Sequence, residues 1–364
     1  MVDPSSSPDP ASDRPPLSAA SLTLRLGGIA VIVAALAGVF AYVNGTLDPQ
    51  RLTPKALVNV LEKNNGVHPG FRRNHSKGVC VAGYFESSGE ARAYSSAQVF
   101  MDARTPVVGR FALPSGNPYA PDGSVPIRSL ALRFTQANGQ QWRTGMNSMP
   151  VFPVGTPEAF YQFQQAQSPD PATGKPNPTA VPAFFAAHPE AVPFLQWIKT
   201  AKPSASYATE TYNGINAFYL VNPAGQRQAV RWGVVPLTAD AADAPPAQGA
   251  DYLEQDLTKR LAAGPLRWRL DITLANPGDP VNDASKPWPT DRKVLNAGTL
   301  VLESTQAQDN GECRDINYDP LILPSGIEGS EDPLLAARSA AYASSYLRRT
   351  SEVSQLPATQ ESRP

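Results

Sequence analysis

Proline is the feature that most limits what this chain can fold into. The 364 residues include 38 prolines, about twice the average usage. Proline fixes φ and lacks a backbone N–H donor, so loops, turns and strand edges tolerate it, whereas long helices and central strands do not. Loops, turns and short strands are therefore favoured over a long helical bundle. We predict a domain of the α+β class or one that is mostly β.

Composition and charge exclude other classes of protein. Apolar residues make up 41% of the chain, which is enough for a sizeable core and excludes a wholly disordered chain. The 31 Lys and Arg residues against 32 Asp and Glu residues give a net charge of -1, so no basic surplus favours a nucleic-acid partner. The three His and two Cys residues lack the spacing of a zinc site. A disulfide between Cys80 and Cys313 is conceivable in an oxidising compartment, although their spacing does not argue for it.

An uncharged apolar run near the N-terminus, Leu26 to Val43, predicts a membrane-associated helix. Its 18 residues would span roughly 27 Å as a helix, about one bilayer core. We expect residues 1–21, which are rich in Ser and Pro, to be a disordered tail, and residues 22–45 to be a membrane anchor or signal segment. An uncleaved anchor is favoured over a cleaved signal or a buried core helix. The position predicts a domain on the extracytoplasmic, periplasmic side, either anchored or secreted.

The remaining chain predicts one folded domain over residues 46–350, followed by a flexible tail over 351–364. Short β-branched and apolar runs between Gly, Pro and Asn predict antiparallel strands, and apolar residues three or four apart predict helices between them. The predicted strands are 79–85, 107–113, 129–134, 217–222, 229–235, 268–274 and 295–302. The predicted helices are 157–166, 182–198, 252–261 and 333–347, with a surface loop over 239–250. This alternation is typical of the α+β class.

The first candidate motif is the run RRNHSKG at 72–78, immediately before the strand predicted at 79–85. His75 lies just before this apolar strand. An imidazole in such a position can act as a general base near neutral pH. Arg72 can anchor an anion. Taken alone, the run is equally typical of a solvated basic loop with a surface or core histidine.

The second candidate motif lies near the C-terminus. The run SEDP at 330–333 supplies an N-cap, an acidic first turn and an early proline, which predict a helix start. On that helix Arg338 and Tyr342 are four residues apart and share a face, and Arg349 follows about two turns later. The pair is either a partly buried tyrosine with an ion-pairing arginine or a phenolate held ionised by the guanidinium, and a phenolate is a metal ligand.

With both motifs in view, the sequence resembles the haem catalase family. The run at 72–78 and the GYF at 83–85 resemble its distal motif, and DP at 319–320, GIE at 326–328 and the Arg338–Tyr342 spacing resemble its proximal motif. TPV at 105–107 with RF at 110–111, and DASKPWP at 283–289, resemble further family segments. The likeness runs from Pro54 to Arg349 and is greatest to the small catalase-related peroxidases. It implies that 46–350 is a catalase-like haem-binding domain, an antiparallel β-barrel of about eight strands with surrounding helices, after one N-terminal membrane helix.

The resemblance also implies roles for particular residues. Tyr342 would be the axial ligand of haem b iron, and Arg338 would keep its phenol deprotonated. His75 would transfer the proton of the bound peroxide. The other implied haem contacts are the propionate-binding Arg72, Arg110 and Arg349 and the stacking Phe160.

Two departures from the family pattern concern the distal side. The family's distal Asn falls on Ser148 without a gap, and a local shift would let Asn147 serve instead. A serine that supports the distal histidine in the family is Ala112 here. We therefore expect a peroxidase that reduces organic peroxides, and hydrogen peroxide with weak catalase activity, using a small reducing donor. The alternatives are a haem-dependent hydroperoxide isomerase or lyase and a non-catalytic haem-binding protein. The oligomeric state is left open.

Overall fold

The computed structural model describes residues 18–43, 47, 51–237 and 249–355, and the chain divides into the units Met1–Thr53 and Pro54–Pro364. In the first unit, helix α1 (Ala19–Val43) has no buried side chain and is long and apolar enough to cross a membrane. It begins where Ser18 Oγ accepts a hydrogen bond from Ser21 N–H (3.3 Å), the pattern of a helix N-cap. Residues 19–21 are thus helical, which corrects the boundary of the predicted tail. Residues 1–17 lie outside the described part.

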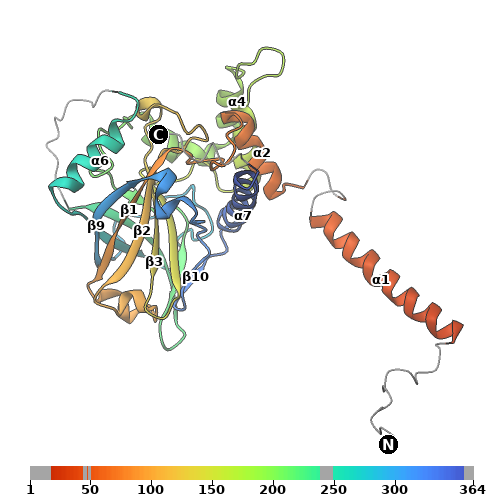
Figure 1. Cartoon of the computed structure of the whole chain (residues 1–364). Coiled ribbons are helices and arrows are strands. Elements are labelled where there is room, and N and C mark those ends of the chain that lie inside the picture. Colours follow the sequence, from red (N-terminus) through yellow and green to blue (C-terminus); the bar gives the residue numbers. More distant parts are fainter. Residues whose placement is uncertain (1–17, 44–46, 48–50, 238–248, 356–364) are drawn as a thin grey trace, which may run out of the picture. The chain divides into compact units, whose positions relative to one another are not determined.

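The second unit is built around a closed antiparallel barrel (Figure 1). The pairing runs β5–β4–β3–β2–β1–β9–β8, and β7 pairs with both β8 and β5, so the sheet closes on itself. Two short strands, β6 (Phe218–Val221) and β10 (Ile327–Gly329), extend the sheet beside β7. The barrel strands are β1 (Gly78–Ser87), β2 (Thr105–Ala112), β3 (Ser129–Thr135), β4 (Gln141–Asn147), β5 (Tyr212–Asn213), β7 (Arg227–Pro236), β8 (Leu266–Leu274) and β9 (Val294–Ala307). The expected eight-stranded barrel is confirmed.

The inside of the barrel is the main hydrophobic core. Phe111, Leu130 and Met146 stand opposite one another on β2, β3 and β4, and each is buried. Trp142 stacks on Phe134, with ring centroids 4.6 Å apart. Because side chains alternate between the two faces of a strand, the neighbours of these residues on β2, β3 and β4 point out of the barrel.

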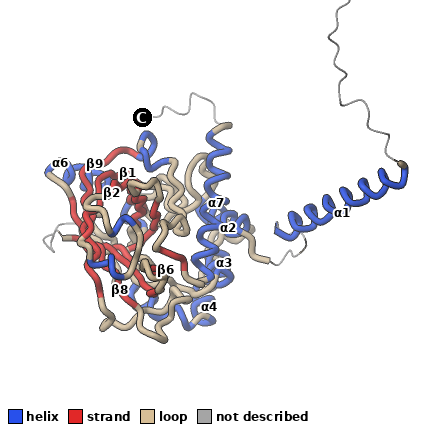
Figure 2. Tube along the Cα trace, turned by 90° about the horizontal axis from the view of Figure 1, so that it is seen from below, coloured by secondary structure: helices blue, strands red, loops and turns tan. Residues whose placement is uncertain are grey.

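Helices cover that outer face on one side. The helices are α2 (Pro54–Asn65), α3 (Pro157–Ala166), α4 (Ala180–Ala187), α5 (Val192–Ile198), α6 (Tyr252–Ala263) and α7 (Pro333–Val353). Figures 1 and 2 show α2, α4 and α7 gathered on one side of the strands and α6 on the other, beside β9. The α7 helix starts as expected, because the side chain of Asp332 accepts a hydrogen bond from Leu334 N–H (2.9 Å) and Pro333 takes the first helical position.

Some elements differ from the sequence-based expectation. Helix α2 and strands β4, β5 and β10 have no counterpart among the predicted elements. The predicted helix 182–198 is split into α4 and α5 by a 3₁₀ turn at Pro189–Ala191, because a proline removes a helical hydrogen bond. Helix α7 continues to Val353, so residues 351–353 belong to the folded unit and not to a tail. The loop predicted at 239–250 lies mostly outside the described residues, as do residues 356–364.

A disulfide joins two distant parts of the second unit. Cys80 on β1 is bonded to Cys313, with Cα atoms 5.3 Å apart and a sequence separation of 233 residues. Cys313 lies in the 3₁₀ turn Glu312–Arg314. Both cysteines are buried. The bond therefore fixes this turn against the strand that follows the His75 loop.

Candidate active site

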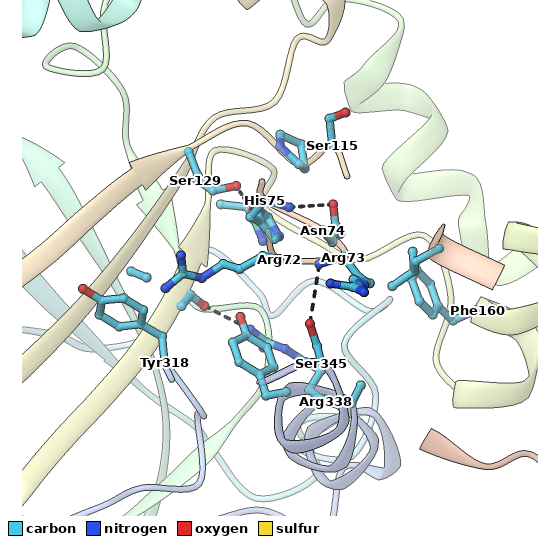
Figure 3. A pocket seen from close by; sticks show the side chains of 18 of the residues that line it. Arg72, Arg73, Asn74, His75, Ser115, Ser129, Phe160, Tyr318, Arg338 and Ser345 are labelled. Atoms are coloured by element: carbon cyan, nitrogen blue, oxygen red, sulfur yellow. Dashed lines mark hydrogen bonds between the residues drawn. The ribbon is translucent and has the colours of Figure 1, made fainter. Parts of the chain in front are cut away.

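A cavity of about 600 Å³ lies outside the barrel, between β2–β4 and helices α2, α3 and α7 (Figure 3). It brings together the residues of both candidate motifs, which lie near opposite ends of the second unit. Its lining includes Arg72, His75, Arg110, Asn147, Phe160, Arg338, Tyr342 and Arg349. Figure 3 shows His75 and Ser129 on one side and Arg338 and Ser345, from α7, on the opposite side.

Two rows of outward-facing strand residues form the floor of the cavity. In the first row Arg110, Ala131 and Gly145 stand opposite one another on β2, β3 and β4. In the second row, two residues along each strand, the positions are Ala112, Ser129 and Asn147. Two residues of extended strand separate the rows by about 7 Å, so each row faces a different wall of the cavity.

The first row lies against α7. We call the group formed by Gly145, from this row, and Arg338 and Tyr342, from α7, the proximal wall. A Cβ atom at Gly145 would lie 3.4 Å from both the Tyr342 hydroxyl oxygen and Arg338 Nη2, so the ends of both side chains lie against this position of β4. Arg338 Nη2 donates a hydrogen bond to the Gly145 carbonyl oxygen (3.3 Å). The shared helix face expected for Arg338 and Tyr342 is confirmed.

A hydrogen-bond network fixes Arg338 from behind. Its Nη1 donates to Asn216 Oδ1, and Asn216 Nδ2 donates to Asp332 Oδ2 (2.8 Å). Asp332 is also the N-cap of α7, and burial raises the pKa of its carboxyl group. The start of the helix and the guanidinium beside Tyr342 are therefore held by one connected set of groups.

Three guanidinium groups crowd another side of the cavity. Arg72 Nη2 donates to the carbonyl oxygens of Cys313 (3.1 Å), Arg314 (2.9 Å) and Ile316 (3.0 Å). Burial, and then the charges of Arg110 and Arg349, lower the pKa of Arg72 well below its ordinary value.

The other two guanidinium groups are held in similar ways. Arg349 donates to the Arg314 carbonyl oxygen, and Arg110 Nη2 donates to the Ser76 carbonyl oxygen (2.9 Å). Burial lowers the pKa of Arg110 to about 10. Within the described chain no ion pair links Arg72 or Arg110 to a carboxylate. Arg349 has one carboxylate nearby, since its Nη1 lies 3.7 Å from Asp315 Oδ1. Three buried guanidinium groups with so few carboxylates nearby favour the binding of a ligand that carries carboxylates.

The second row lies against the His75 loop, and we call His75, Ala112, Ser129 and Asn147 the distal wall. Apart from glycines, His75 is the residue with a positive φ (56°) in the described chain. Its backbone N–H donates to Asn74 Oδ1 (2.9 Å). Among the residues that the structure describes, the buried Nδ1 atom of its ring has no hydrogen-bond partner, and Ala112 offers no hydroxyl.

The imidazole of His75 is neutral at physiological pH. Burial, and then the charges of Arg110, Arg338 and Arg72, lower its pKa to about 3. A neutral imidazole accepts a proton at its free ring nitrogen, which is what a general base requires.

The structure chooses between the two candidates for the distal amide. Asn147 lines the cavity, whereas Ser148 does not. Ser148 Oγ accepts a hydrogen bond from the Arg128 backbone N–H (3.0 Å) instead. The ungapped expectation for Ser148 is therefore corrected: Asn147, the last residue of β4, lines the cavity, whereas Ser148 lies beyond the strand and bonds to the Arg128 backbone.

Aromatic residues complete the cavity on the helix side. Phe160 of α3 lines it, with its ring centroid 5.5 Å from that of Phe152. Tyr318 lines it as well, and burial raises the pKa of its phenol to about 12. The cavity is lined by the phenol of Tyr342, the imidazole of His75 and several guanidinium groups. Such a lining fits a flat, largely apolar ligand that carries a metal and two carboxylates.

Four residues of the site were not expected from the sequence. Ser129, Asn216 and Tyr318 carry no local pattern that distinguishes them, because their roles come from neighbours that are distant in sequence. Gly145 does leave a signal, since a single glycine within a strand often marks a close approach of another group. That signal is readable only once β4 is recognised.

The fold and the site together define a class of protein, closed antiparallel barrels with a cavity outside the barrel that is lined by a phenol, an imidazole and several guanidinium groups. A profile of the family described as Catalase matches residues 51–363. A catalase-related peroxidase of Synechococcus elongatus is 40% identical over 305 residues, which cover 82% of this chain and 89% of that protein. One of Mycolicibacterium paratuberculosis is 30% identical over 306 residues, with coverages of 82% and 95%.

Solved structures agree on the fold. A bacterial catalase matches with a TM-score of 0.68 at 23% identity, over 78% of this chain and 58% of that one. Catalase A from Saccharomyces cerevisiae matches with a TM-score of 0.70 at 20% identity, over 78% of this chain and 62% of that one. The chain belongs to the catalase family. Family membership implies a haem cofactor and supports a peroxide-acting oxidoreductase.

Proposed function

We propose that this protein is a haem b peroxidase that reduces organic hydroperoxides, and hydrogen peroxide with weak catalase activity, using a small external electron donor. The observation that carries the proposal is the single cavity in which His75 and Tyr342 come from opposite walls. A shared haem pocket gives both residues a role.

The residues of the cavity fit haem b. Tyr342 would supply an oxygen ligand for the haem iron, and Arg338 lies beside it. Phe160 offers an aromatic face to the porphyrin. The guanidiniums of Arg72, Arg110 and Arg349 lie together without enough carboxylates around them, and two propionates would supply these.

When bound, haem b supplies an iron centre that accepts two oxidising equivalents from a peroxide. This chain's contribution on the distal wall is proton transfer. His75 is neutral, so Nε2 takes the proton of the hydroperoxide and returns it to the oxygen that departs. The oxygen that receives this proton would leave as water or an alcohol, and bound haem would supply the electrons for cleavage of the O–O bond.

The distal wall supports peroxidase activity over catalase activity. A catalase has to orient a second hydrogen peroxide molecule beside the oxidised cofactor, which demands well-placed distal groups. Here the Nδ1 atom of His75 is unpartnered and Ala112 has no hydroxyl to offer it. The relatives from Synechococcus elongatus and Mycolicibacterium paratuberculosis are both named catalase-related peroxidases.

We also propose that the barrel works outside the cytoplasm, held at a membrane by α1. Two observations support this location. The apolar length of α1 is suited to a bilayer, and the Cys80–Cys313 disulfide suits an oxidising compartment. Fractionation with and without detergent, together with thiol labelling of the isolated protein, tests it. Full-length protein in the cytosolic fraction with free thiols would contradict the location.

Steady-state turnover of the haem-loaded protein tests the activity. Consumption of an organic hydroperoxide with a dye donor is compared with oxygen release from hydrogen peroxide, and we expect the first to dominate. Dominant oxygen release would identify an ordinary catalase. Rearranged product without donor consumption would identify an isomerase or lyase. Bound haem without turnover would identify a haem-binding protein.

A further inference from the structure

Ser129 is the central residue of the distal row. It stands directly opposite Ala112 on β2 and Asn147 on β4, and all three line the cavity. The side chains of directly paired strand residues lie on the same face of the sheet, close enough to interact. Ser129 is 6% and Asn147 is 8% exposed, so both polar side chains need partners within the protein or in a ligand.

The hydroxyl group of Ser129 is committed to Asn147. Its Oγ donates to Asn147 Oδ1 over 2.6 Å. A carboxamide carries its acceptor and its donors on opposite sides of Cγ. With Oδ1 engaged by the serine, the side that Asn147 can offer to a ligand is Nδ2, which only donates.

The Ser129 hydroxyl does not serve the other polar side chain of the distal wall, the ring of His75. Among the described residues the Nδ1 atom of His75 has no hydrogen-bond partner, and Figure 3 shows Ser129 on the same side of the cavity as His75. The serine hydroxyl nevertheless bonds to the amide. On the distal wall, the side chain of Ser129 therefore fixes the Asn147 amide. The imidazole of His75 is positioned by its backbone conformation and by packing.

We propose that Ser129 is a positioning residue that holds the Asn147 carboxamide with its N–H groups toward the cavity. Asn147 then donates a hydrogen bond to the oxygen of a peroxide, or to a small anion, bound opposite Tyr342. The inference rests on the proposed function, because it requires haem in the cavity. Without Ser129, the amide is free to rotate and to present its acceptor side, which repels an electron-rich ligand.

Cyanide binding to the ferric, haem-loaded, full-length protein tests the proposal, since affinity is read from the absorption spectrum and not from turnover. We expect Ser129→Ala and Asn147→Ala each to weaken cyanide binding about fivefold, the effect of one hydrogen bond. Ser129→Thr keeps the hydroxyl and should restore affinity to within about twofold. Ser115→Ala is the matched control, because Ser115 also lines the cavity but bonds to Asn65.

The double variant Ser129→Ala with Asn147→Ala separates positioning from a merely structural role. If the serine acts through the amide, the double variant binds cyanide no more weakly than Asn147→Ala alone. Additive losses, or wild-type affinity in Ser129→Ala, would overturn the proposal. Asn147→Asp retains an oxygen for Ser129 and removes the N–H donors, so it keeps the inference testable if Ser129→Ala fails to fold. Wild-type affinity in Asn147→Asp would also overturn it.

The proposed function fails separately from this inference. A wild-type protein that binds no haem, or one that binds haem without reacting with peroxide, contradicts the peroxidase assignment. Normal peroxide reactivity with equal cyanide affinity in wild type and Ser129→Ala contradicts the positioning role alone.

Discussion

On the proximal wall, Arg338 is tied through Asn216 to the N-cap of α7, whereas on the distal wall the Nδ1 atom of His75 has no partner. Connected side chains hold Arg338, whereas His75 itself takes a backbone conformation with a positive φ. A metal ligand has to stay in one place and one protonation state, so a rigid network suits it. The role proposed for His75 requires a free ring nitrogen that accepts and returns a proton. The two walls therefore differ as their proposed tasks differ.

The largest effect should come from the proximal wall. Tyr342→Phe removes the anionic ligand, and we expect the purified variant to retain little haem. Haem content and the ferric absorption spectrum measure it. Tyr346→Phe, one turn later and also in the cavity lining, is the matched control and should retain haem. Full occupancy with an unchanged spectrum in Tyr342→Phe would reject Tyr342 as the ligand.

The next effect concerns the distal wall and sharpens the contrast. His75→Gln should keep haem, because the proximal wall is intact, and should slow the reaction with peroxide by about 10²- to 10⁴-fold, the usual contribution of a general base. Stopped-flow absorption measures the rate. His68→Gln provides the control and should react normally. A normal rate in His75→Gln would assign the proton transfer to another group.

The disulfide holds the turn whose carbonyl oxygens accept hydrogen bonds from the guanidinium groups of Arg72 and Arg349. Cys313 and Arg314 accept hydrogen bonds from Arg72, and Arg314 accepts one from Arg349. Replacing Cys80 and Cys313 together by Ala should lower the free energy of unfolding by about 2–5 kcal/mol and speed haem loss. Thermal unfolding and transfer of haem to an acceptor protein measure the two effects. Unchanged haem loss would show that the turn keeps its shape without the bond.

The smallest effect is a pH dependence of stability. The pKa of His75 lies at about 3 in the folded chain against about 6.5 for an unperturbed His, so between these values the unfolded chain binds more protons. The stability due to the neutral ring is complete above about pH 6.5 and falls by up to about 1.4 kcal/mol per unit as the pH drops toward 3. His75→Gln should therefore lose less stability than the wild type on acidification from pH 7 to pH 4. An equal loss of stability in the two proteins between pH 7 and pH 4, measured from their melting curves, would contradict the lowered pKa of His75.

Much of this protein is determined by its sequence alone. The N-cap run at 330–333 begins α7, and the four-residue step from Arg338 to Tyr342 places both on one helix face, because helical periodicity is local. Alternating apolar residues likewise specify most of the barrel strands, and the length of the run at 26–43 specifies α1.

Tertiary structure decided what depends on pairing between distant segments. Strand β4 has two polar residues and a glycine between its buried Trp142 and Met146, so its own pattern is weak and its strand conformation is stabilised by β3. That pairing also placed Asn147, the last residue of β4, at the cavity, whereas Ser148 lies beyond the strand. The partnership of Ser129 with Asn147, the bond between Cys80 and Cys313, and the shift in the pKa of His75 arise in the same way. Each depends on distances across the fold, and local sequence carries no information about those distances.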